Sequence, residues 1–113
     1  MGYETQFNLT LFGASSIDVD HMEQALAEKG ILYHALEPDE EAPDTFRDSR
    51  PASWLRHEEE MRDISKRFSD ILFVLNGAGE NAGDLWIKYF KGGKMQRCNA
   101  DITYPPFDKT QLE

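Results

Sequence analysis

Residues 70–104 read DILFVLNGAGENAGDLWIKYFKGGKMQRCNADITY, and this stretch decides the fold. An apolar run at 71–75 precedes a glycine-rich break, and an alternating run at 85–90 leads to the pair Gly92-Gly93. Short apolar runs separated by glycines are typical of β-strands, and two adjacent glycines favour a tight hairpin. The stretch therefore predicts three consecutive strands, the last of which ends at Tyr104, before two prolines.

A helix is predicted immediately before these strands. Ser53 is placed to cap it, and its apolar stripe is formed by Trp54, Met61, Ile64 and Phe68. His57 completes the helical spacing of that stripe, so this helix is expected to lie across the sheet.

The first third of the chain predicts a strand, a helix and a second strand. Residues 3–11 alternate between apolar and polar side chains, which is the pattern of a half-buried strand. Asp18 is placed to cap a short amphipathic helix that ends at Lys29-Gly30. The apolar run at 31–36 is too short for a helix and is predicted to be a strand.

Residues 37–52 carry prolines at positions 38, 43 and 51, which exclude long regular structure. We expect an exposed acidic loop with room for one short edge strand. The chain is expected to form one domain over residues 1–113, with a short irregular tail after residue 104. The last two residues, Leu112-Glu113, have the composition of a vector-derived remnant, so no argument rests on them.

Composition limits the classes of partner. The chain has 21 acidic and 12 basic residues and a formal charge of −9, which disfavours direct binding to nucleic acids and to anionic membranes. The single cysteine, Cys98, forms no internal disulfide, and the start of the chain lacks a signal-like or membrane-spanning apolar run. A cytoplasmic location is therefore expected.

The run from Met61 to Leu75, followed by the run from Gly79 to Gln96, resembles small ferredoxin-like proteins that bacteriophages and mobile elements encode. The resemblance covers residues 53–104. It implies an α+β ferredoxin-like sandwich, with two helices packed on one face of a mainly antiparallel sheet of about five strands. It also implies a mobile-element setting, in which short acidic proteins often inhibit host defence systems, but it transfers no catalytic residue.

No set of residues in the sequence has the pattern of a catalytic site, and neither a cofactor nor a metal is expected. The three histidines lack the spacing of a helical metal site. Cys98 and the serines lack the glycine-flanked turn of a nucleophile. The chain is therefore more typical of an interaction protein than of an enzyme.

An alternative reading is a small-molecule module or weak enzyme that uses the cleft between helices and sheet. The residues nominated for it are His57, Gly77, Gly79 and Gly83. Closely spaced glycines let backbone amides approach an anion. This loop, however, leads into a strand and carries Glu80 and Asp84, so a hairpin or bulge connection explains it better.

The leading hypothesis is a non-enzymatic acidic protein that binds a host protein with a basic surface, such as a defence or nucleic-acid-handling protein. Its interaction residues are expected on the acidic loop and on the second helix: Glu37, Asp39, Glu40, Glu41, Asp44, Glu58 and Glu59. Trp86 and Phe90 are added as an aromatic patch on an outer sheet face, since aromatic residues are favoured at interface centres. A structural homodimer that forms through this sheet face is the third reading.

Overall fold

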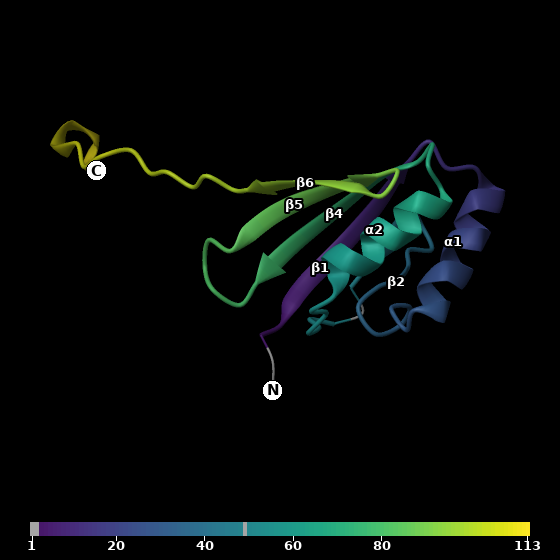
Figure 1. Cartoon of the computed structure of the whole chain (residues 1–113). Helices are drawn as coiled ribbons and strands as arrows, with labels where there is room; N and C mark the ends of the chain where they lie inside the picture. Colours follow the sequence, from purple (N-terminus) through teal and green to yellow (C-terminus); the bar gives the residue numbers. More distant parts are fainter. Residues whose placement is uncertain (1–2, 49) are drawn as a thin grey trace.

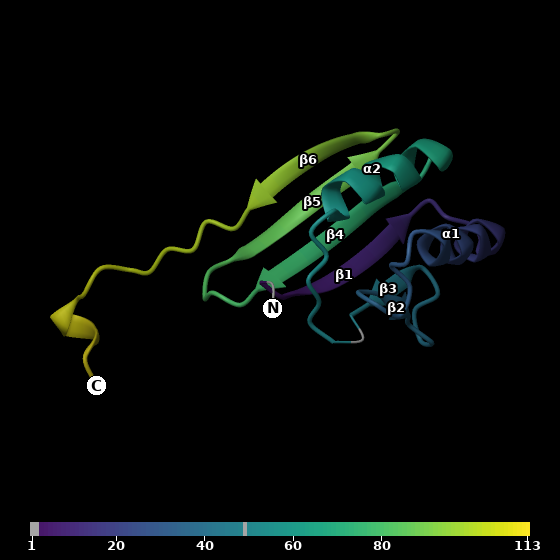
Figure 2. The ribbon, with the colours of Figure 1, turned by 60° about the horizontal axis from the view of Figure 1, so that its bottom comes forward.

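The computed structural model describes residues 3–48 and 50–113. It contains two α-helices on an antiparallel sheet of six strands in the order β2-β3-β1-β4-β5-β6. The α+β class and the antiparallel sheet are confirmed, and the strand count is six where about five were expected. Figure 2 shows β6 at one edge of the sheet and β2 with β3 at the other.

The centre of the sheet is formed by β1 (Thr5–Phe12) and β4 (Leu72–Gly79), which pair along their full lengths. The alternation predicted for β1 is confirmed, because Phe7, Leu9 and Leu11 are buried on one side. Their neighbours on β4, Phe73 and Leu75, are buried on that same side. This face of the sheet is therefore the one that carries the core.

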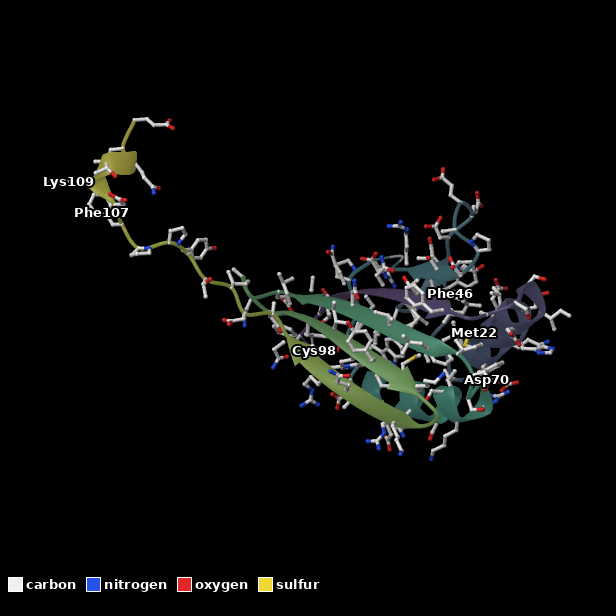
Figure 3. All side chains as sticks on the ribbon, turned by 90° about the horizontal axis from the view of Figure 1, so that it is seen from above. Met22, Phe46, Asp70, Cys98, Phe107 and Lys109 are labelled. Atoms are coloured by element: carbon white, nitrogen blue, oxygen red, sulfur yellow. The ribbon has the colours of Figure 1, made fainter. Side chains whose placement is uncertain are left out.

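Both helices cover that face (Figure 1). The helix α1 (Ser16–Glu28) contributes Met22 and Leu26 to the core, and α2 (His57–Arg67) contributes Met61 and Ile64. Figure 3 labels Met22 of α1 and Phe46, which belong to the same buried core cluster. The opposite sheet face has no helix over it in the described part of the chain.

Both predicted helix caps are displaced. Ser15, not Asp18, is the N-cap of α1, and Asp18 completes a reciprocal capping box from the third helical position. The second helix begins at His57 rather than after Ser53, and its N-cap Arg56 makes no side-chain cap hydrogen bond. Trp54 consequently lies before the helix, although it is buried as expected.

The segment 31–36 is not the predicted strand. It forms a compact turn in which Ile31, Ala35 and Leu36 are buried and Tyr33 has a positive φ of 63°. The sheet instead continues through two very short strands, β2 (Glu37–Pro38) and β3 (Thr45–Arg47). The predicted acidic loop is therefore a hairpin at the edge of the sheet, with two short strands rather than one.

The predicted Gly92-Gly93 hairpin is confirmed between β5 (Leu85–Lys91) and β6 (Lys94–Asn99). Both glycines have positive φ, which is the requirement of the favoured two-residue turn. The buried Ser65 hydroxyl accepts the Gly93 N–H at 2.8 Å, so the turn is attached to α2. The sheet ends at Asn99, five residues earlier than predicted, and the tail after it contains only the short 3-10 helix η1 (Lys109–Gln111).

Candidate functional site

Net charge divides the molecule into two parts. Residues 3–48 contain 11 acidic and two basic residues, and residues 50–113 contain ten of each. The whole formal charge of −9 therefore belongs to the first part, which we call the acidic half; residues 50–113 are the neutral half. The acidic half includes α1 and the β2-β3 edge of the sheet, whereas β4, β5, β6 and α2 belong to the neutral half.

The β2-β3 hairpin holds its shape through Asp39. One carboxylate oxygen accepts the Arg47 Nε–H at 2.5 Å, and the other accepts the Glu41 N–H at 3.0 Å. The Asp39 N–H donates to the Thr45 carbonyl at 3.0 Å. The Arg47 hydrogen bond, followed by that from Glu41, lowers the pKa of Asp39. Asp39 is thus a structural residue of the hairpin and is not a free interaction group.

Three other predicted carboxylates of the hairpin face solvent. Glu40, Glu41 and Asp44 are exposed, and we call them the acidic tip; Glu37 is half-buried on β2. Backbone hydrogen bonds hold the tip, because the Asp44 carbonyl accepts the Leu11 N–H at 2.8 Å and the Thr45 N–H donates to the Ala42 carbonyl at 2.9 Å. The three charges therefore lie on a fixed backbone rather than on a loose loop.

The acidic residues at the start of α2 are arranged differently. Glu58 pairs with Lys88 at 3.0 Å and with Arg97, and Glu59 pairs with Arg56 at 2.9 Å. Glu60 accepts the Trp54 indole N–H at 2.8 Å. The predicted interaction residues Glu58 and Glu59 thus form ion pairs with cations of the same chain.

Lys88 is the buried centre of this second cluster. Its side chain is 8% exposed, and its ammonium lies 3.0 Å from Glu58, 2.6 Å from His57 Nε2 and 4.1 Å from the Trp86 ring centroid. An ammonium taken out of water needs such partners, because an unpaired buried charge is strongly unfavourable. The Lys88 cluster, formed by Lys88, His57, Glu58, Arg97 and Trp86, therefore supports the packing of α2 on β5 and β6.

The hydrogen bonds of His57 fix its protonation. Nδ1 lies 2.8 Å from the Trp54 carbonyl and must donate, so Nε2 is left to accept from Lys88. Burial lowers the pKa of His57, and the Lys88 charge lowers it further against the opposing effect of the Trp54 carbonyl. His57 is therefore neutral in the folded protein. Burial opposes ionisation of Glu58, but its bonds to Arg97 and Lys88 lower its pKa to about 2.

The predicted outer aromatic patch is wrong. Trp86, Lys88 and Phe90 share the helix-covered face of β5, and Phe90 is fully buried in the core. Trp86 stacks on His57 with ring centroids 5.2 Å apart. The open face of β5 carries Leu85, Ile87 and Tyr89 instead, because strand alternation sends the two sets to opposite sides.

The glycines of the alternative ligand site, Gly77, Gly79 and Gly83, lie in two different places. Gly77 lies within β4 opposite Trp86, and an added Cβ would lie 2.1 Å from the indole ring. Gly77 and His57 thus both contact Trp86, one on the sheet and one on the helix. Gly79 packs against Asp84 and the Tyr3 hydroxyl, and Gly83 has a φ of 89° in the β4-β5 turn. These close approaches explain the glycines as packing and turn residues.

His57 lines none of the three best-formed surface depressions in the described part of the chain. Two of these depressions lie on the open sheet face. In residues 3–48 and 50–113, no group of three or more His, Cys, Asp or Glu side chains could hold a metal ion. No helix in the same ranges is long and apolar enough to cross a membrane.

Lys88 is the central residue that the sequence interpretation missed. It stands between Trp86 and Phe90 at the spacing of one strand face, so a lysine on a face with two large aromatics was the available signal. Comparison of the chain with family models, with curated proteins and with solved structures gave no match.

Proposed function

We propose that this protein is a non-enzymatic interaction protein that binds a basic surface of another protein through the acidic tip. The observation that carries the proposal is the contrast between carboxylates. Glu40, Glu41 and Asp44 point to solvent on a fixed hairpin, whereas the acids of α2 are paired within the chain. Fixed exposed charges of one sign attract a complementary surface at long range and steer its approach.

The partner class rests on the resemblance of residues 53–104 to small proteins of bacteriophages and mobile elements. In that setting we propose a cytoplasmic host protein with a basic nucleic-acid groove, such as a defence protein or a nucleic-acid-handling enzyme. An acidic tip would occupy part of that groove and compete with phosphates. Direct binding of this chain to nucleic acid is disfavoured by the same negative charge.

We further propose that the fold is a ferredoxin-like sandwich with an added hairpin. The elements β1, α1, β2, β3, α2 and β4 follow one another in the β-α-β-β-α-β order of that fold. Their strands lie in the spatial order β4-β1-β3-β2, which is the ferredoxin-like order, and β5 and β6 extend the sheet beyond β4.

The test is quantitative capture of host-cell proteins on three immobilised proteins. The first is the wild type, and the second is Glu40→Lys/Glu41→Lys, which reverses two tip charges and keeps Asp39 in place. The third is Asp20→Lys/Asp70→Lys, a control with the same change in net charge at two exposed positions away from the tip. Bound proteins are eluted with a soluble polyanion, which displaces ligands from basic grooves.

The proposal expects a nucleic-acid-handling protein that the wild type and the control capture alike, that the polyanion releases, and that the tip variant fails to capture. Equal capture by all three proteins would reject the acidic tip as the binding surface. Loss of capture by both variants would assign the effect to net charge and would also reject it.

A further inference from the structure

The C-terminal tail makes few contacts with the rest of its own chain. Every residue from Asn99 to Glu113 is exposed, and Figures 1 and 2 show the tail extending away from the sheet. Near its start, the Ala100 N–H donates to the Leu85 carbonyl at 2.9 Å, and Ile102 lies near Gly83. Figure 3 shows Phe107 and Lys109 far from every strand.

This tail is apolar enough to be a binding segment. Tyr104 is 85% exposed and Phe107 is 80% exposed, and Ile102 is 47% exposed. Three large apolar side chains are thus exposed within six residues of an extended segment. Neighbouring exposed apolar groups of this kind mark interaction sites. Pro105 and Pro106 between them favour an extended backbone, which presents the side chains without a large loss of entropy.

The open face of the sheet offers a matching surface. The side chains of Leu72, Val74, Ile87 and Tyr89 are half-buried at its centre, with no helix above them in the described residues. One depression of about 540 Å³ includes Leu85, Ile87 and Cys98, near the point where the tail leaves the sheet. A second of about 600 Å³ includes Leu72, Tyr89 and Gln96, near the Gly92-Gly93 turn.

The second depression and the tail carry charges of opposite sign. Lys91 and Lys94 line the second depression, whereas the tail carries Asp101 and Asp108 beside its apolar residues. Both surfaces belong to the neutral half, so two copies can approach there without the repulsion that two acidic halves would create.

Geometry favours the tail of a second copy over the tail of the same chain. To reach its own second depression, a tail would have to reverse direction completely within residues 100–104, ahead of the extended Pro105-Pro106 segment. The strand β6 is the edge of the sheet, and its outer backbone groups are free to pair with another strand. When the tail itself, rather than β6, runs antiparallel along β6 of a second copy about a two-fold axis, it passes Gln96 of that copy on its way to the Gly92-Gly93 end and needs no reversal.

We propose that two copies of this chain form a reciprocal dimer in which the tail of each copy lies on the open sheet face of the other. Tyr104 and Phe107 bind over the depression formed by Leu72, Tyr89 and Gln96, and Lys91 and Lys94 face the tail carboxylates. The surfaces differ from the predicted Trp86 and Phe90 contact, and the dimer does not depend on the acidic tip. It would place the two acidic halves at opposite ends of the assembly.

The first test is the mass of the full chain by light scattering over a range of concentrations. The wild type is expected to approach the mass of a dimer, and Tyr104→Ser/Phe107→Ser is expected to remain a monomer. The matched control is Ile17→Ser/Leu55→Ser, which removes two exposed apolar side chains from other surfaces and should still dimerise. A monomeric wild type at all concentrations, or a serine tail variant that still dimerises, would overturn the proposal.

The second test identifies the contact. Two chains lacking Cys98 through Cys98→Ser are mixed, one with Phe107→Cys and the other with Gln96→Cys, under mild oxidation. The proposal expects a disulfide between the two different chains. The control replaces Phe107→Cys by Asp20→Cys on α1 and should give at least tenfold less cross-linked product. Equal yields in both mixtures, or no product in either, would overturn the proposed placement of the tail.

Discussion

The acidic hairpin and the Lys88 cluster use the same carboxylate chemistry in opposite ways. In the hairpin, one acid, Asp39, pairs with Arg47, and the tip acids beyond it point to solvent. In the Lys88 cluster, Glu58 turns inward onto Lys88 and Arg97, and no acid is left over for a partner. The first region carries unbalanced charge on its surface, whereas the second uses balanced charge to hold two layers of the fold together.

The difference shows that acidic composition does not by itself locate a binding surface. The sequence places nine acids within 37–60, but the structure gives them unequal roles. A buried ion pair supports the fold only when its partners remain together, whereas exposed carboxylates contribute little to stability and remain free for a partner. Substitutions in the two regions should therefore separate stability from binding.

The largest expected effect on stability comes from Lys88→Ala. It removes the buried ammonium, leaves His57 Nε2 without its donor and opens a cavity beside Trp86. Removal of one partner of a buried pair typically costs about 3–5 kcal/mol. Urea denaturation should show a loss of this order, and Lys88→Met, which keeps most of the side-chain volume, should lose less. A loss below about 1 kcal/mol for Lys88→Ala would contradict the structural role of the cluster.

Gly77→Ala is expected to have the next largest effect. The added methyl group would lie 2.1 Å from the Trp86 ring, which also stacks on His57. Overpacking of this kind costs about 1–3 kcal/mol in the free energy of unfolding. Combining Gly77→Ala with Trp86→Phe should recover part of that loss, which a double-mutant cycle measures. Strictly additive losses would show that the two positions do not contact each other.

Low pH should destabilise the folded protein, because it protonates His57 and Glu58 of the Lys88 cluster. The folded-state pKa of His57 lies below its ordinary value of 6.5, so its contribution is present above pH 6.5 and is lost as pH falls. The pKa of Glu58 falls from 4.5 to about 2, so its contribution is complete above pH 4.5 and is lost as pH falls toward 2. Solvent screening limits the Glu58 contribution to roughly 1–2 kcal/mol.

The measurement is the free energy of unfolding as a function of pH. Glu58→Gln should remove the Glu58-dependent part of the decrease below pH 4.5, and a matched Glu59→Gln, at an exposed pair, should leave the profile close to that of the wild type. Identical pH profiles for the wild type and Glu58→Gln would contradict the assigned role of Glu58.

The smallest expected effect on stability comes from reversing the acidic tip. Glu40→Lys/Glu41→Lys changes only exposed side chains, so the free energy of unfolding should stay within about 0.5 kcal/mol of the wild type. Asp39→Ala should destabilise the fold more than the tip reversal, because it removes the carboxylate that holds Arg47 and the Glu41 N–H. Thermal unfolding of both variants compares the two kinds of acid directly.

Much of the fold could be predicted from local patterns. The alternation of β1, the two-glycine hairpin and the Met61 and Ile64 stripe of α2 all have the expected structure, because each is encoded by nearby residues. The apolar run at 31–36 was predicted wrongly, since so short a run has no period that separates a strand from a buried turn. The strands β2 and β3 have two and three residues, too few to leave a pattern.

The Lys88 cluster could be predicted only in part, for a different reason. Its partners are separated by 31 residues for His57 and Lys88 and by 39 for Glu58 and Arg97, so their contact depends on how α2 packs on β5 and β6. The same packing places Trp86 and Phe90 on the helix-covered face of the sheet, whereas the sequence pattern predicted them on the outer face. For the acidic loop the sequence indicated the charges correctly, but only the hairpin geometry distinguishes Asp39 from the tip.

The most direct test of the account is the affinity of the captured host protein for the wild type, Glu40→Lys/Glu41→Lys and Lys88→Met, each measured at low and at physiological salt. If the acidic tip is the binding surface, the tip variant loses at least tenfold in affinity and most of the salt dependence while remaining as stable as the wild type. Lys88→Met then loses stability but binds the partner with unchanged affinity. Unchanged affinity of the tip variant, or a comparable loss in Lys88→Met, would contradict the assignment of binding to the acidic tip.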